Sequence, residues 1–138
     1  MSSTGPFQSS VSSAFKNIGD CYLKMQGKMD KAIEHYKECL LNEQKIGISP
    51  NQGISKIYAE TFMKLFNTKM QCCDWNNYYA YIDELKKIIL KQYQSGDLPC
   101  IDPFSMFMLD FRMEDKLEIS RKWAESEKNK AFEDMKRD

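Results

Sequence analysis

The chain has 138 residues, of which 42% are hydrophobic and 29% are charged, and its 20 basic and 20 acidic residues give a net charge of zero. This length and composition predict one globular domain that can bury a core. Because the charges balance, no net field draws the chain to nucleic acid or to an anionic membrane, and we expect neither as a partner.

The sequence predicts a cytoplasmic or nucleocytoplasmic protein. No apolar run approaches the roughly 20 residues of a membrane span, and residues 1–6 lack the basic and apolar parts of a secretory signal. In that compartment the five cysteines are expected to be reduced. Cys72 and Cys73 are adjacent rather than spaced as metal ligands, so no metal site is expected.

The first predicted helix covers residues 13–25 and follows a Ser-rich segment. Residues 1–12 combine many serines with Gly5 and Pro6, which predicts a disordered lead-in. From Phe15 onward apolar residues recur every three or four positions, the period of a helix with one buried face. Gly27 ends this helix. The stripe expected to face inward is Phe15, Ile18, Tyr22 and Met25.

The second and third predicted helices cover residues 30–46 and 52–71. Asp30 is a favourable N-cap, and Gly47 stands where a left-handed C-terminal cap favours glycine. Pro50 and Asn51 restart the chain before the third helix. The residues expected to face inward are Met29, Ala32, Ile33, Tyr36 and Leu40, then Ile57, Phe62, Leu65 and Phe66.

The fourth predicted helix, residues 76–93, has the clearest periodicity in the chain. Its apolar residues fall on one face of a 3.6-residue helix, and Gly96 follows as a stop. The apolar set is Tyr78, Tyr81, Ile82, Leu85, Ile88, Ile89 and Tyr93.

The last segments are a loop and a charged helix. A Pro-containing loop is expected over residues 97–105, residues 106–111 are apolar but too short to assign, and a helix begins near Met113. Residues 125–138 form a charged helical tail. No segment alternates apolar and polar residues as a strand does. The prediction is therefore an all-α fold.

Residues 13–71 resemble the helices of tetratricopeptide repeats. Gly19 and Ala32 are small where two helices of a pair approach, and Tyr22 and Tyr36 fill the space beside them. The resemblance implies antiparallel helix pairs, a fragment of a right-handed α-superhelix, followed by junction helices. One pair cannot bury its own face, so it implies support from the junction or from further repeats outside this chain.

The concave face of such repeat arrays binds an extended peptide or protein. Asn17 stands just before Ile18 and Gly19, where repeats of O-GlcNAc transferases carry an inward asparagine. A primary amide can donate to and accept from a peptide backbone, so Asn17 is a candidate peptide-binding residue. The alternative is a polar residue in solvent.

Residues 72–124 resemble the junction where O-GlcNAc transferases pass from repeats to catalytic region. The matching elements, in order, are Cys73-Asp74-Trp75, a long amphipathic helix, Gly96-Asp97-Leu98-Pro99, Pro103-Phe104 and Trp123-Ala124. The resemblance implies a parent activity that transfers N-acetylglucosamine from UDP-GlcNAc to protein serine or threonine. It assigns this chain the repeat and junction scaffold. Physically, Asp74 is expected to cap or turn the chain and Trp75 to be a buried anchor.

The loop at Asp102 corresponds to a histidine-rich loop that approaches the active site in animal O-GlcNAc transferases. Here Asp102 stands in place of the first histidine, so an imidazole role does not carry over. Asp102 is a candidate active-site-loop equivalent. The alternative is a turn aspartate before proline.

No catalytic residue is expected in this chain. It contains no Gly-rich phosphate loop, and its one histidine, His35, is expected on a solvated face. We therefore expect no turnover and no bound cofactor from this chain alone, UDP-GlcNAc being the family's donor. The alternative function is a standalone tetratricopeptide-like adaptor that mediates protein–protein interaction. The structural anchors predicted for either function are Gly19, Ala32, Tyr36 and Trp75.

Overall fold

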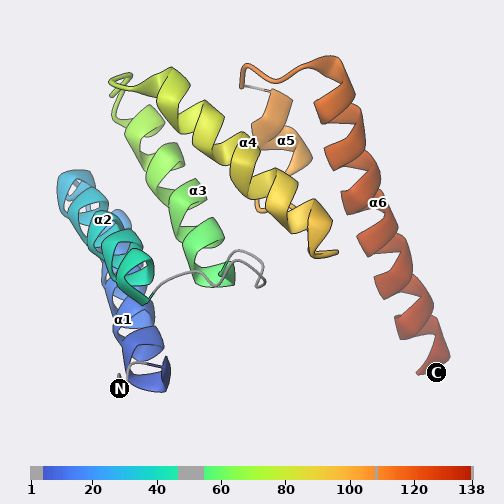
Figure 1. The fold of residues 1–138 in the computed structure, drawn as a ribbon, viewed down its shortest axis with the longest axis horizontal. Helices are drawn as coiled ribbons and strands as arrows, with labels where there is room; N and C mark the ends of the chain where they lie inside the picture. Colours follow the sequence, from blue (N-terminus) through green and yellow to red (C-terminus); the bar gives the residue numbers. More distant parts are fainter. Residues whose placement is uncertain (1–4, 47–54, 108, 138) are drawn as a thin grey trace. The chain divides into compact units, whose positions relative to one another are not determined.

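The computed structural model describes residues 5–46, 55–107 and 109–137. They form six helices and no strand, so the all-α prediction is confirmed (Figure 1). The predicted glycine cap at Gly47 and the restart at Pro50 and Asn51 lie outside the described residues. The helices are α1 (Gly5–Leu23), α2 (Met29–Ile46), α3 (Lys56–Gln71), α4 (Tyr78–Gln94), α5 (Pro103–Phe107) and α6 (Met113–Lys136).

The chain divides into two compact units, Met1–Leu85 and Lys86–Asp138, and the boundary falls within α4. The first unit holds α1, α2, α3 and the start of α4. The second holds the rest of α4, α5 and α6. No helix among the described residues combines the length and apolar content needed to cross a bilayer.

In the first unit α1 and α2 run antiparallel and in close contact (Figure 1). The side chains of Ala32 and Tyr36 are fully buried. A Cβ atom on Gly19 would lie 2.7 Å from Cε1 of Tyr36, so only glycine lets the ring sit there. This is the close approach of small residues that the sequence predicts.

A polar network beside this contact joins α1 and α2 to α3. The Tyr36 hydroxyl donates a hydrogen bond of 2.6 Å to Oδ1 of Asp20, and Lys64 Nζ lies 2.8 Å from both carboxylate oxygens. Burial alone raises the pKa of Asp20, but these hydrogen bonds outweigh it and hold the pKa below its usual value. Burial and the Asp20 carboxylate together raise the pKa of Tyr36 well above its usual value.

Helix α1 begins at Gly5, which corrects the predicted disordered lead-in over residues 1–12. Residues 1–4 lie outside the described residues, and the serines that follow are helical. Ser12 is fully buried, and Asn42 Nδ2 on α2 donates to its hydroxyl oxygen at 2.7 Å. Packing on α2 therefore outweighs the low helical preference of the Ser-rich sequence.

Two expectations about the faces of the first helix pair are wrong. Ile18 and Met25, expected inward, are exposed. His35, expected on a solvated face, is half-buried, and its ring centroid lies 5.2 Å from that of Tyr22. The buried face of α1 carries Ser12 and Gly19, which are not large apolar residues. A prediction from apolar residues alone therefore places the buried face of α1 wrongly.

Helix α3 supplies much of the core of the first unit. Ser55 caps its N-terminus by accepting from the backbone N–H of Tyr58 at 3.2 Å. Lys69 is buried without being isolated, because its Nζ lies 4.3 Å from the centre of the Tyr81 ring and 3.7 Å from Asp74. The apolar residues of α3 that are buried are Tyr58, Ala59, Phe62, Met63, Leu65 and Phe66.

Trp75 is not the buried anchor that the sequence predicts, because 58% of its surface is exposed. Cys73 and Asn77 on either side of it adopt left-handed backbone angles, with φ of 58° and 60°. Asp74 accepts from the backbone N–H of Asn76, as a turn-forming aspartate does. This tight turn leaves the indole outside the core, and its ring meets that of Tyr78 edge to face, with centroids 5.8 Å apart.

In the second unit Trp123 fixes the loop over residues 96–102. Trp123 on α6 is half-buried, and its Nε1 donates to the carbonyl of Ile101 at 2.8 Å. Buried Gln92 on α4 accepts from the backbone N–H of Cys100 at 2.9 Å. Gly96 ends α4 with φ of +76°, a conformation that favours glycine. The loop from 96 to 102 is thereby fixed to both α4 and α6.

We predict that Trp123→Ala destabilises the chain by about 2 kcal/mol or more, because it removes a half-buried ring and the hydrogen bond to Ile101. Trp75→Ala is the matched control and should cost less than about 1 kcal/mol, because that ring is mostly exposed. Urea denaturation followed by circular dichroism measures both. A larger loss for Trp75→Ala would contradict the assignment of the two tryptophans.

Candidate peptide-binding groove

A groove in the first unit is lined by α2, α3 and the start of α4, and its volume is about 540 Å³. Each helix contributes residues spaced three or four apart, so each presents one face to it. The lining residues are Lys37, Leu40, Leu41 and Gln44 from α2, Tyr58, Phe62 and Leu65 from α3, and Asn77, Ala80, Tyr81 and Glu84 at the start of α4.

The floor of the groove is apolar and aromatic. Leu40, Tyr58, Phe62 and Leu65 each expose less than a tenth of their surface. The rings of Tyr58 and Phe62 stack with centroids 6.3 Å apart, and Phe62 lies 5.5 Å from the Tyr81 ring. These contacts fix the floor in place, so the groove is formed before any ligand arrives.

The rims carry polar and charged groups of both signs. Lys37 is exposed on the α2 side and Glu84 is half-buried on the α4 side. Burial raises the pKa of Tyr58, a hydrogen bond with the Gln44 side chain lowers it, and the negative charge of Glu84 raises it again, so the net change in its pKa is upward. Leu41 on the α2 rim is 51% exposed. The groove thus offers an apolar floor with few, separated polar groups.

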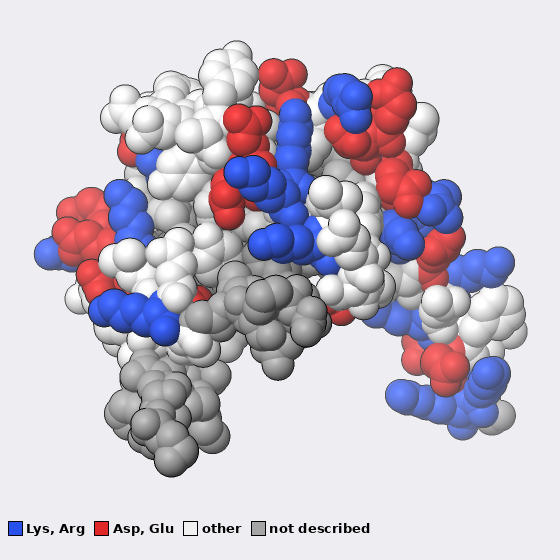
Figure 2. All heavy atoms as spheres, viewed as in Figure 1, with Lys and Arg blue, Asp and Glu red and all other residues white. Residues whose placement is uncertain are grey.

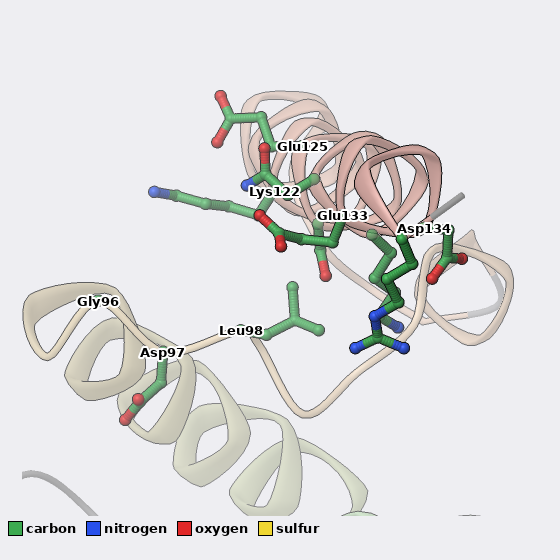
Figure 3. A pocket seen from close by; sticks show the side chains of 11 residues that line it. Gly96, Asp97, Leu98, Lys122, Glu125, Glu133 and Asp134 are labelled. Carbon is green, nitrogen blue, oxygen red and sulfur yellow. The ribbon is translucent and has the colours of Figure 1, made fainter.

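A second hollow, in the other unit, has a different character. It has a volume of about 570 Å³ and lies between residues 96–98 and the C-terminal half of α6. Leu98 points toward α6 while Asp97 points away from it (Figure 3). Its charged lining residues are three bases, Lys122, Lys130 and Arg137, and four acids, Asp97, Glu125, Glu133 and Asp134. Such a mixed surface has no single charge with which to select a ligand.

Asn17 lies on α1 and is exposed, and it is not among the residues that line the groove. Charged neighbours on this side of α1 are engaged with α3: Lys16 lies 3.6 Å from Glu60, and Lys64 is bonded to Asp20. A peptide-binding role for Asn17 stays a prediction.

Asp102 acts as a cap in the structure. Its Oδ1 accepts from the backbone N–H of Ser105 at 2.6 Å, at the start of the short α5. This is the turn role that the sequence left as an alternative. Of the four predicted structural anchors, Gly19, Ala32 and Tyr36 pack the first helix pair. The fourth, Trp75, is exposed on the turn between α3 and α4.

The sequence did not single out the groove because its residues come from three helices. Leu41 is an exposed residue next to buried Leu40, Ala80 is exposed between exposed Tyr79 and half-buried Tyr81, and no motif marks either of them. The available signal was the second apolar position on α2, where Leu41 follows Leu40. Two adjacent leucines cannot both face one core, so one of them had to lie on or near the surface.

Within the part of the chain that the structure describes, no three His, Cys, Asp or Glu side chains gather as a metal ligand set would. No family model matches the chain, and neither a curated protein nor a solved structure matches it.

Proposed function

We propose that this chain is a helical binding scaffold that holds a peptide or protein segment in the groove of α2, α3 and α4. The observation that carries the proposal is the buried aromatic floor of the groove beneath an exposed leucine rim. Binding sites for apolar-anchored segments combine such a floor with a few polar groups that fix orientation. The ligand is an apolar-anchored segment, with side chains spaced to reach Tyr58 and Phe62.

The resemblance to O-GlcNAc transferases supports a more specific form of this proposal. In that form α1 and α2 are a tetratricopeptide-like pair, and residues 72–124 are the junction that leads to a catalytic region. The chain then presents a substrate or partner to an enzyme that transfers N-acetylglucosamine. The tight contact between Gly19 and Tyr36 is of the kind that such repeats use.

A standalone adaptor is the second candidate. The same groove supports it, because a binding module needs no attached transferase. Sequencing of the genomic DNA beyond the coding segment separates the two: a glycosyltransferase core in the same reading frame favours the first, and its absence there favours the adaptor.

We expect the purified chain to transfer no sugar when it is incubated with UDP-GlcNAc and Ser/Thr acceptor peptides. A diphosphate needs convergent positive charge or helix N-termini, whereas the hollow beside α6 carries more acids than bases. Mass spectrometry of the peptides measures the transfer. A mass gain of one N-acetylhexosamine above the protein-free control would contradict this expectation.

The groove is tested by selecting a phage-displayed library of random peptides on the wild-type chain. Leu41→Glu places a carboxylate at the apolar rim, and we expect selected peptides to bind this variant at least about tenfold more weakly, a loss of about 1.4 kcal/mol. Leu90→Glu is the matched control, because Leu90 is 57% exposed and lies outside the groove.

Fluorescence anisotropy of labelled peptides measures these affinities. The proposal fails if no peptide is enriched, or if the enriched peptides bind the Leu41→Glu and Leu90→Glu variants equally well.

A further inference from the structure

The outward face of α6 carries a line of exposed apolar side chains. Met113 is 63% exposed, Leu117 is 64% exposed and Met135 is 71% exposed. Ala124 and Ala131 lie between them and are exposed as well. These five residues are separated by four, seven, seven and four positions, so they lie on one stripe of the helix. We call this stripe the α6 outer face.

The opposite side of α6 is turned toward its own unit. Ile119 is almost fully buried, and Trp123 is bonded to the loop at Ile101. Farther along, Ser126 and Asn129 face the hollow beside residues 96–98. Helix α6 therefore has two distinct sides. The outer face carries three of its exposed large apolar side chains, Met113, Leu117 and Met135, and a fourth, Phe132, is 51% exposed beside that face.

The α6 outer face is arranged symmetrically about its central residue. Leu117 and Ala131 each lie seven positions from Ala124, and Met113 and Met135 each lie eleven positions from it. A second α6 running in the opposite direction across Ala124 therefore meets the same spacing: Met113 lies opposite Met135, Leu117 opposite Ala131, and Ala124 opposite its own copy. A face that matches itself in this way is the requirement for a two-fold interface.

We propose that two copies of this chain associate through antiparallel pairing of their α6 outer faces. Small side chains at Ala124 let the two helices approach closely at the centre, and the methionines pack over the ends. Helix α6 has 24 residues, long enough to form several turns of contact. This inference is independent of the groove and of the function proposed for it.

The charges beside the outer face fit the same pairing. Arg121 lies 2.6 Å from Glu118 and 2.8 Å from Glu125 within its own helix, and Lys128 follows on the same flank. Basic and acidic side chains alternate along α6 (Figure 2). In the antiparallel pair Glu118 comes within about two positions, or 3 Å of helix rise, of Lys128 on the second copy.

Arg121 meets Glu125 of the second copy at the same offset, so one register satisfies both ion pairs. In a parallel pair Leu117 lies beside Leu117, but the flank that carries Glu118, Arg121 and Lys128 lies on opposite sides of the pair in the two copies, so neither ion pair forms. The observations therefore favour the antiparallel arrangement.

Sedimentation equilibrium on the whole chain is the first test. We expect the wild type to associate reversibly into a dimer and Leu117→Glu to weaken that association at least tenfold with unchanged helical circular dichroism. The matched control is Leu90→Glu, which lies on α4 and should leave the association unchanged.

Disulfide trapping tests the direction of the helices. With Cys21, Cys72, Cys73 and Cys100 replaced by serine, a chain carrying Leu117→Cys is mixed with a longer, tagged chain carrying Ala131→Cys and mildly oxidised. We expect a mixed disulfide between the two chains, because opposed Cα atoms at about 6 Å can be bridged. Asn129 faces the hollow and lies outside the α6 outer face, so chains carrying Asn129→Cys should form no disulfide between copies.

Three results would overturn the proposal. They are a wild-type chain that stays monomeric at every concentration, a disulfide that the Leu117→Cys chain forms with itself in place of the mixed one, and a dimer that forms no mixed disulfide. The second result indicates parallel helices, and the third places the dimer interface elsewhere.

Discussion

The Tyr36 side chain is the element on which the first unit depends. Its ring occupies the space that a side chain on Gly19 of α1 would fill. Its hydroxyl donates a hydrogen bond to Asp20, which is also on α1. Lys64 then joins Asp20 to α3 through both carboxylate oxygens. A buried hydrogen bond to a charged group contributes about 1.5–3 kcal/mol. The side chains of Asp20 and Lys64 are 30% and 38% exposed, so screening by solvent reduces the contribution of their ion pair. Tyr36 thus links α2 to α1 and Lys64 links α3 to α1, beside the apolar core that α3 supplies.

This arrangement also explains why the groove lies where it does. Tyr36 fixes α2 against α1, and Leu40, one turn farther along α2, lines the groove together with Leu41. The stacked rings of Tyr58 and Phe62 close the floor. The groove is therefore a consequence of helix packing that uses no residue with catalytic chemistry. That is the physical reason for proposing a binding scaffold.

The sequence predicted much of the fold because helical periodicity is a strong local signal. The apolar face of α4 is an example, since Ile82, Leu85 and Ile88 are all buried as expected. Close approach of two helices at Gly19 was predicted from the small size of that residue, and the Tyr36 ring lies against it.

The sequence misled where a polar contact or a backbone turn decides burial. Ser12 is buried through its bond to Asn42, so α1 starts far earlier than a Ser-rich segment suggests. Trp75 is exposed because the left-handed residues on either side of it turn it outward. The groove was missed because side chains of three helices form it, and pairings between helices leave no local pattern.

The packing of Tyr36 on Gly19 is tested most directly by a double-mutant cycle with Gly19→Ala and Tyr36→Leu, measured by urea denaturation. In the wild-type background Gly19→Ala forces a methyl group against the ring and should cost about 1–3 kcal/mol. With Tyr36→Leu the ring is gone, and the same change should be neutral or stabilising by up to about 1 kcal/mol, because alanine favours the helix over glycine. Close packing of Tyr36 on Gly19 is contradicted if Gly19→Ala stabilises the wild-type chain, or if its effect is the same in both backgrounds.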